Sequence, residues 1–219
     1  MELKGKRIAF LGDSITEGVG VSAPEHIYWQ VLARHTGAQA FGYGISATRI
    51  APQRFPTVNA PWEDQHFASR VEAMEENMDV VVVFGGTNDY GHGDAAIGCI
   101  TDTTEDTFFG AYHVLVQKLM RKYPCATLVL MTPLHRADED RGYYNERGIR
   151  LNGPLSAYAQ AIREIAAYYG LALVDLHRDC PIQPAVEQSR LAYAPDGLHP
   201  NDAGAALVAH CLQRKLESL

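Results

Sequence analysis

Short apolar runs and helical stripes of apolar residues alternate along this chain of 219 residues. A run rich in β-branched residues predicts a strand, and apolar positions three or four residues apart predict one face of a helix. The runs predict five strands, at residues 7–11, 39–43, 79–84, 126–131 and 171–175. The stripes predict helices at residues 27–35, 105–123 and 155–169, and a last helix capped by Asn201 or Asp202.

The third run, residues 79–84, is apolar on both faces of the strand that it predicts. Such a strand belongs in the middle of a parallel sheet that helices cover on both sides. Alternation of strands with helices is typical of the same architecture. We find no internal repeat and no linker-like segment, so we expect residues 1–219 to form a single domain of the α/β class. Its predicted form is a three-layer α/β/α sandwich with a five-stranded parallel sheet.

Four long stretches show neither pattern and are expected to be irregular. They are residues 51–63, 90–103, 135–153 and 177–195. In an open α/β sheet the ligand crevice lies beyond the carboxyl ends of the strands. The first three stretches follow strands at those ends, so they are candidate walls or lids of a crevice. Plain surface loops without a functional role are the alternative.

Composition narrows the class of protein. Hydrophobic residues make up 47% and charged residues 21%, as in ordinary globular proteins, and the formal net charge is −7. A negative chain is a poor partner for nucleic acid or for an anionic membrane surface. The apolar runs are far shorter than the ~20 residues of a membrane helix. The first residues lack the apolar region of a secretory signal, so we expect a cytoplasmic protein with reduced cysteines.

The first candidate for chemistry is the segment Gly12-Asp13-Ser14-Ile15-Thr16, which directly follows the first predicted strand. Ser14 is expected near the start of a helical turn, where its own N–H can face a developing oxyanion. The segment is not the G-x-S-x-G elbow of α/β-hydrolases, because Thr16 stands in place of the second glycine. The alternative is that Ser14 only caps a helix.

The second candidate is an acid and a base in one turn, Asp196 and His199. A serine hydroxyl is a weak nucleophile at neutral pH and needs an imidazole base, which must be held in one tautomer. An aspartate three residues before the histidine can do this from the same turn. In the structural alternative, Asp196 caps the turn and His199 is exposed.

Two further positions follow predicted strands and offer hydrogen-bond donors. Asn88 follows the central apolar strand, and its carboxamide can reach into the crevice; asparagine is also common in turns of no functional importance. Gly44 follows the second strand, where a glycine lets a backbone N–H approach a ligand closely, or merely allows a turn. Together with Ser14, Asp196 and His199, they fill every role needed for acyl transfer.

The order Ser14, Gly44, Asn88 and His199 resembles the four sequence blocks of the SGNH hydrolase (GDSL-like esterase/lipase) family, over essentially the whole chain. The resemblance implies a flavodoxin-like α/β/α sandwich and no cofactor. It implies that Ser14 is the nucleophile, His199 the base and Asp196 its orienting acid. The oxyanion hole would be the N–H groups of Ser14 and Gly44 with the Asn88 side chain.

The sequence departs from the family pattern at two positions. Ile15 replaces the leucine of the family name, and Ala47 stands where a second glycine often follows Gly44. Neither change removes a group that the resemblance makes catalytic.

The family includes sugar deacetylases, short-chain esterases, thioesterases and lysophospholipases. The chain has no long apolar lid segment, which favours a small-molecule ester with a small acyl group, such as an acetyl ester of a carbohydrate. A lysophospholipase or thioesterase is the alternative within the family. A non-catalytic binding module of the same fold is the alternative outside it, and it predicts the loss of a triad member, which the sequence does not show.

Other motifs carry less weight. Residues 18–23 fit the dinucleotide fingerprint G-x-G-x-x-A, but they begin too late after the strand and lack the acidic residue that the ribose needs. His92 and Asp94 have no second histidine at ligand spacing, so no metal site is expected there and His92 is interpreted as a residue of the crevice rim. Four more side chains are weaker candidates for the pocket lining: Arg49, Trp62, Tyr90 and His135.

Overall fold

Five parallel strands form one sheet in the computed structural model, which describes residues 1–140 and 153–219. The strand order is β2-β1-β3-β4-β5. The strands are β1 (Arg7–Gly12), β2 (Gln39–Gly44), β3 (Val80–Phe84), β4 (Thr127–Met131) and β5 (Ala172–Val174). Each predicted strand is confirmed, with its ends shifted by one residue at most.

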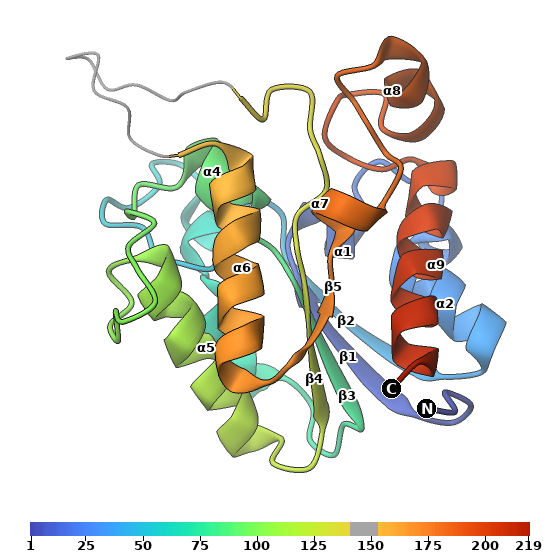
Figure 1. Cartoon of the computed structure of the whole chain (residues 1–219), viewed down its shortest axis with the longest axis horizontal. Helices are drawn as coiled ribbons and strands as arrows, with labels where there is room; N and C mark the ends of the chain where they lie inside the picture. The colour runs from blue at the N-terminus through green and yellow to red at the C-terminus, as the bar shows by residue number, and fades with distance from the viewer. Residues whose placement is uncertain (141–152) are drawn as a thin grey trace.

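Helices cover both faces of this sheet (Figure 1). One face carries α2 and α9, which pack on each other, and the other carries α3, α5 and α6. The helices are α1 (Ser14–Glu17), α2 (Tyr28–Thr36), α3 (Phe67–Arg70), α4 (Thr87–His92), α5 (Phe108–Lys122), α6 (Leu155–Tyr169), α7 (Leu176–Asp179), α8 (Glu187–Tyr193) and α9 (Asp202–Glu217). Short 3₁₀ turns lie at Pro24–His26, Pro61–Asp64 and Val71–Ala73. The predicted three-layer α/β/α architecture is confirmed.

The predicted helices are also confirmed, and their capping residues explain where they begin. α5 begins at Phe108 rather than at residue 105, because the Thr107 side chain caps it by accepting a hydrogen bond from the Gly110 N–H at 3.1 Å. α9 is capped by Asn201, whose side chain accepts from the Gly204 N–H at 3.0 Å. Of the two cap residues that the sequence offered, the structure uses Asn201.

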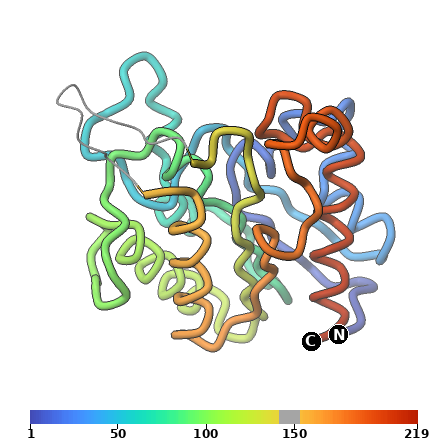
Figure 2. The backbone as a smooth tube through the Cα atoms, turned by 45° about the horizontal axis from the view of Figure 1, so that its top comes forward, coloured from blue at the N-terminus to red at the C-terminus, as the bar shows by residue number. Residues whose placement is uncertain are grey.

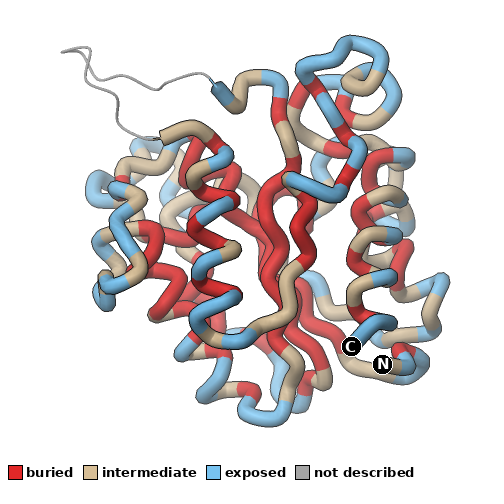
Figure 3. The backbone as a smooth tube through the Cα atoms, viewed as in Figure 1, coloured by how far each residue is buried: buried red, intermediate tan, exposed pale blue. Residues whose placement is uncertain are grey.

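The central strand β3 is buried along its whole length, as its sequence predicts. Side chains of a strand alternate between its two faces. Val81 and Val83 therefore join the core under α5 and α6, whereas Val80 and Val82 join the core under α2 and α9. Burying one such side chain contributes roughly 1.5–3 kcal/mol. Figure 3 shows the strands as the buried centre and the outer faces of the helices as the exposed layer.

The stretches predicted to be irregular are only partly so. Residues 177–195 contain most of α7 and all of α8, which corrects the prediction. α8 was missed because it buries no residue and so has no apolar stripe to read. Residues 90–103 begin inside α4. Most of the stretch 135–153 lies outside the described residues.

The strand order places a topological switch between β1 and β3. From β1 the chain continues to β2 on one side, and from β3 it continues to β4 on the other. In open α/β sheets ligands bind at such a point, beyond the carboxyl ends of the strands. Figure 2 brings this edge of the molecule forward, with the loop after β2 (cyan) projecting from it. The two chain termini lie elsewhere, side by side, and the Met1 ammonium donates to the Leu216 carbonyl at 3.0 Å (Figure 1).

Candidate active site

Ser14 is the first residue of α1 and lies directly beyond the end of β1. Asp13, not Ser14, caps this helix, because the Asp13 carboxylate accepts a hydrogen bond from the Ile15 N–H at 3.0 Å. The Ser14 hydroxyl is therefore not used as a cap. The Ser14 N–H is one of the groups at a helix start that have no partner within the helix. Ser14 is 6% exposed, so its hydroxyl lies at the floor of a pocket rather than on the open surface.

Ser14, His199 and Asp196 form one chain of hydrogen bonds. The Ser14 Oγ lies 3.0 Å from His199 Nε2, and His199 Nδ1 lies 2.6 Å from Asp196 Oδ2. The other carboxylate oxygen of Asp196 accepts from the backbone N–H groups of His199 at 2.7 Å and Leu198 at 2.9 Å. These contacts fix the turn and the ring together, although 185 residues separate Ser14 from His199.

The same contacts set the charge of Asp196. Partial burial raises the pKa of this carboxyl, but hydrogen bonds from the His199 ring and from the backbone of Leu198 and His199 outweigh it and hold the pKa below its ordinary value. Asp196 is therefore ionised at neutral pH. An ionised acceptor at His199 Nδ1 keeps the proton on that nitrogen, which leaves Nε2 free to accept from Ser14.

The turn that carries His199 packs closely against Gly20, in the loop that follows α1. Gly20 has a φ of +98°, and a Cβ added to it would meet the His199 Cβ at 2.9 Å and the Pro200 carbonyl oxygen at 2.7 Å. A glycine is needed at this close approach. The glycines of the rejected dinucleotide fingerprint thus have a structural role, because Gly18 also ends α1 in the left-handed conformation.

Asn88 lies in the first turn of α4, after β3, and is buried. Its Nδ2 donates to the Thr48 carbonyl at 3.0 Å, which fixes the side chain and leaves the second hydrogen of the amide for another acceptor. Asp89, the next residue, accepts from the Ile50 and Ala51 N–H groups at 3.0 and 2.9 Å. Burial raises the pKa of Asp89 to about 6, against the effect of these hydrogen bonds. α4 thereby holds the segment after β2 in place.

A cavity of about 310 Å³ joins these residues at the switch point. Of the five predicted site residues, Ser14, Asn88 and His199 line it, and Asp196 lies behind His199. The complete lining is Ser14, Val19, Ser46, Ala47, Asn88, Gly91, His92, Arg136, Leu198 and His199.

Gly44 is the predicted site residue that the structure does not bring to this cavity. It ends β2 beside Gly12 of β1, and a Cβ there would meet the Glu17 backbone nitrogen at 2.1 Å. The absence of a side chain at Gly44 lets α1 approach the sheet. Ala47 lines the cavity in its place and has a φ of +62°, in the left-handed region that favours glycine. The sequence held one indication of this role for Ala47, because Ala47 stands where a second glycine often follows Gly44 in the family.

Arg70 lies beneath the site and was not predicted from the sequence. This buried side chain donates to the Tyr43 carbonyl at 2.9 Å and to the Gly12 carbonyl at 3.1 Å, which ties together the ends of β2 and β1. Burial lowers the pKa of Arg70 to about 10. Burial also raises the pKa of Asp13, beside the nucleophile candidate, to about 7. An isolated arginine in a helix gives no sequence signal for such a role.

A second cavity of about 410 Å³ adjoins the first and shares Ala47 and His92 with it. It confirms Arg49 and His92 as pocket-lining residues. Its full lining is Ala47, Arg49, Gln53, Phe55, Pro56, Thr57, Glu63, His92 and Asp94. Among the weaker candidates, Tyr90 is buried in the core and Trp62 is half exposed, and neither lines these cavities.

Arg49 and His92 form a pair between the two cavities, in which Arg49 is buried and His92 reaches the surface. Arg49 is 1% exposed, and its Nη1 lies 2.7 Å from His92 Nδ1. A guanidinium only donates, so Nδ1 accepts and the His92 proton is on Nε2. Burial, followed by the charges of Arg49 and Arg136, lowers the pKa of His92 to about 4. His92 is therefore a neutral donor at the rim, as its position in the sequence suggested, and it does not titrate near neutral pH.

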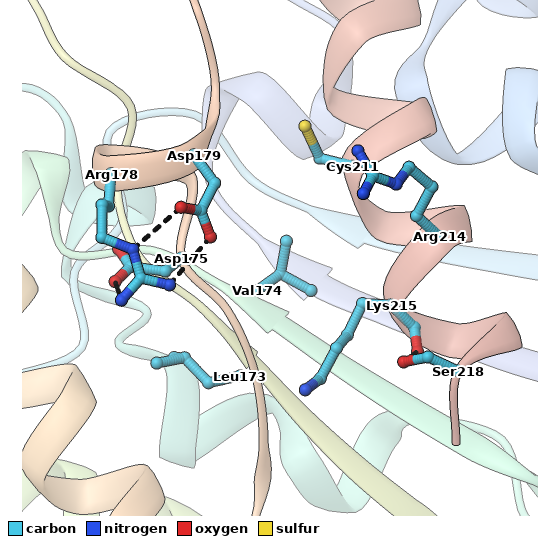
Figure 4. Close-up of a pocket in the computed structure, with 9 residues that line it drawn as sticks. All are labelled: Leu173, Val174, Asp175, Arg178, Asp179, Cys211, Arg214, Lys215 and Ser218. Atoms are coloured by element: carbon cyan, nitrogen blue, oxygen red, sulfur yellow. Dashed lines mark hydrogen bonds and ion pairs between the residues drawn. The ribbon is translucent and has the colours of Figure 1, made fainter.

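A larger cavity lies elsewhere, between β5, α7 and α9, and has a volume of about 730 Å³ (Figure 4). Arg178 lies there against Asp179 and Asp175, and Cys211, Arg214 and Lys215 project from α9. It contains no residue of the Ser14 cluster. Size therefore does not identify the candidate active site; the converging polar groups at the switch point do.

A parallel α/β/α sandwich with a serine, a histidine and an asparagine at its switch point defines the chain as a flavodoxin-like domain of the SGNH type. The chain belongs to the GDSL-like Lipase/Acylhydrolase family, whose model matches residues 10–207. At the level of the family it is therefore a hydrolase of the esterase class. A search of curated proteins found no match.

Solved structures agree with this fold. A protein from Lactobacillus plantarum is 32% identical, with a TM-score of 0.81 over 98% of both chains. A possible lipase from Chitinophaga pinensis is 21% identical, with a TM-score of 0.71 over 97% of this chain and 98% of the other. An acetyl xylan esterase is 24% identical, with a TM-score of 0.65 over 95% of this chain and 98% of the other. The last two similarities show the fold alone.

None of the helices in residues 1–140 and 153–219 combines the length and the apolar character that crossing a bilayer requires.

Proposed function

We propose that this protein is a serine-dependent ester hydrolase in which Ser14 is the nucleophile, His199 the general base and Asp196 the residue that orients the base. The observation that carries the proposal is the unbroken hydrogen-bond chain from Ser14 Oγ through both ring nitrogens of His199 to Asp196, with distances of 3.0 and 2.6 Å. A nucleophile, a base and an orienting acid in mutual contact meet the requirements for acyl transfer. A non-catalytic binding module has no need of this arrangement.

The first step forms an acyl-enzyme. Ser14 Oγ attacks the carbonyl carbon of the ester while its proton passes to His199 Nε2, and the carbonyl electron pair moves onto the oxygen. Collapse of this tetrahedral intermediate breaks the bond to the alcohol oxygen, which takes the proton from His199 and leaves. Asp196 stabilises the imidazolium that exists between these two events.

Water completes the cycle. His199 takes a proton from a water molecule, whose oxygen attacks the acyl carbon, and the second intermediate collapses by breaking the bond to Ser14 Oγ. The proton on His199 returns to Ser14, and the carboxylic acid leaves. The scheme needs no cofactor.

The oxyanion of each intermediate needs donors at the pocket floor. We assign this role to the N–H groups of Ser14 and Ala47 and to the second amide hydrogen of Asn88. Ala47 takes the place expected for Gly44, because Ala47 lines the cavity and Gly44 is packed against α1. Within the described part of the chain, the Ala47 N–H makes no hydrogen bond to a protein group.

Asn88→Ala is expected to lower kcat by about 10²–10³-fold with little change in KM, because the lost donor acts on the oxyanion and not on the ground-state ester. Loss of the Asn88 contact also leaves the buried Thr48 carbonyl unpaired, so the melting temperature should be recorded beside steady-state kinetics. Gln117→Ala is the matched control, since this exposed amide lies on α5. A change in KM alone would make Asn88 a binding residue.

Small acyl esters of a polyhydroxylated alcohol fit the two cavities best. The cavity at Ser14 has room for a short acyl group, and the adjoining cavity presents polar groups suited to hydroxyls, including Arg49, His92 and Asp94. An acetyl ester of a carbohydrate has this combination. The acetyl xylan esterase among the fold neighbours agrees with this choice, although the choice rests on the cavities.

A lipid-type acylhydrolase is the second candidate, and one observation favours it. Phe55, Val58 and Trp62 are 77%, 82% and 51% exposed, on the loop that also lines the second cavity. Exposed apolar side chains beside a pocket are typical of a surface that contacts an apolar ligand.

A series of p-nitrophenyl esters from acetate to palmitate distinguishes the two candidates. For the proposed small-acyl esterase, kcat/KM is expected to be highest for acetate or butyrate and to fall by about tenfold or more at octanoate, because the cavity of about 310 Å³ cannot take the longer chain. A maximum at octanoate or beyond would favour the lipid-type candidate. Absence of turnover for every ester would contradict both.

A further inference from the structure

Two turns at the carboxyl edge of the sheet bring together three side chains that the esterase proposal does not use. His135 and Glu139 follow β4, and His177 lies in α7 after β5. The segment after β4 and α7 lie side by side in Figure 1, and the His177 N–H donates to the Thr132 hydroxyl at 2.9 Å. This backbone contact fixes the distance between the two turns.

The donor atoms of these side chains converge. One ligand atom from each of His135, Glu139 and His177 lies within 4.8 Å of the others. The Nδ1 of His135 is 2.8 Å from the Glu139 carboxylate, and the rings of His135 and His177 have centroids 4.0 Å apart. Around a zinc ion the ligand atoms are about 2.0–2.2 Å from the metal, so small side-chain rotations bring all three onto one ion.

One nitrogen in the cluster has no protein partner. The Nδ1 of His177 is buried and makes no hydrogen bond to any described residue. A buried ring nitrogen without a partner costs free energy. An ion pair of His135 with Glu139 alone leaves this nitrogen unexplained, whereas a bound cation explains it together with the convergence of the other two donors.

We propose that His135, Glu139 and His177 form a site for a divalent transition metal of the zinc class. Two imidazoles and one carboxylate are a ligand set that suits zinc, and a water molecule completes a tetrahedron. The three side chains are only partly buried, which gives an ion a path of entry. The sequence indicated no metal site anywhere in the chain, because His177 is far in sequence from His135 and Glu139 and joins them only through the fold.

A bound ion would hold one wall of the candidate active site in position. Arg136 and Ala137, which lie between the ligands His135 and Glu139 in the sequence, both contact that site. Arg136 lines the cavity at Ser14, and its Nη1 donates to the Thr87 carbonyl at 3.2 Å. The Ala137 N–H donates at 2.8 Å to the carbonyl of Gly197, in the turn that carries His199. A metal that joins the turn after β4 to α7 therefore stiffens one wall of the pocket and supports the base.

Titration of the full metal-free chain with Zn²⁺ tests the site. Calorimetry is expected to give one Zn²⁺ per chain with a Kd of about 10 µM or lower. His177→Gln and Glu139→Gln are each expected to weaken binding by about tenfold or more, and circular dichroism checks that both variants are folded. Co²⁺ as a second probe should show visible d–d bands without a thiolate charge-transfer band, since no cysteine belongs to the site.

Two control variants separate this site from other histidines. His26→Gln removes an exposed histidine that also pairs with a carboxylate, Asp202, and should leave Zn²⁺ binding unchanged. His199→Gln should also leave it unchanged, which excludes binding by His199 and Asp196. The proposal is overturned if Zn²⁺ does not bind below about 100 µM. It is equally overturned if binding persists undiminished in both His177→Gln and Glu139→Gln, or if His199→Gln abolishes it.

Discussion

Replacing Ser14 by alanine is expected to lower kcat on p-nitrophenyl acetate by about 10³-fold or more, because Ser14 holds the hydroxyl in contact with His199. Ser46, the other serine of the pocket lining, donates its hydroxyl to Glu17 instead. A factor of 10³ corresponds to about 4 kcal/mol of transition-state stabilisation. The fold should be unaffected, since the Ser14 hydroxyl contacts His199 and the cap of α1 is Asp13. Steady-state kinetics and thermal melting of the variant measure both effects.

Ser69→Ala is the matched control, because the hydroxyl of this exposed serine donates to the His66 carbonyl and lies outside the lining of the cavity. A p-nitrophenyl alkylphosphonate gives an independent measurement: Ser14 Oγ displaces p-nitrophenolate from phosphorus and gains the phosphonyl group, which peptide mass spectrometry locates. Retention of more than about a tenth of the activity in Ser14→Ala would remove Ser14 from the mechanism, as would labelling of a different residue.

Asp196→Asn is expected to lower kcat by about 10³–10⁴-fold through the tautomer of His199. The asparagine oxygen can still accept from the backbone N–H groups of Leu198 and His199, so the turn is kept. Its amide would then donate to His199 Nδ1, which forces the ring proton onto Nε2. A histidine with its proton on Nε2 cannot accept one from Ser14.

The matched control for this prediction is Asp179→Asn. Asp179 is also an exposed carboxylate paired with a neighbour in sequence, Arg178, and it does not line the cavity at Ser14. Kinetics at neutral pH and the melting temperature of both variants separate loss of catalysis from loss of stability. A variant Asp196→Asn with nearly full kcat would show that His199 keeps its orientation without the carboxylate.

Most of the fold could be predicted from local pattern. The strand β3 reads as buried on both faces from its sequence alone, and it is buried on both faces. The helix α6 has the predicted bounds because an apolar stripe marks its length and Gly170 ends it in the left-handed conformation. α8 was not predicted, because a helix with no buried residue has no apolar stripe along its sequence.

The site was predictable as far as residue type and strand ends determine it. Ser14 and Asn88 follow from the rule that polar residues after parallel strands meet at one edge of the sheet. His199 was predicted differently, because a serine nucleophile needs an imidazole base that a nearby acid orients. The position of Gly44 did not follow, since its distance to α1 depends on how the helix packs on the sheet. The same is true of Arg70, whose contacts with the ends of β1 and β2 have no local signature.

The sequence by itself determined the α/β class, the order of the strands along the chain and the candidate residues for the proposed serine hydrolase. Only the tertiary structure decided that Ala47 lines the pocket, that Arg49 donates to His92, and that His177 reaches His135 and Glu139. Hydrophobic periodicity reports the burial of each element, which is a local property. The contacts of Ala47, His92 and His177 join turns far apart in the chain, and the packing of helices on the sheet sets their distances.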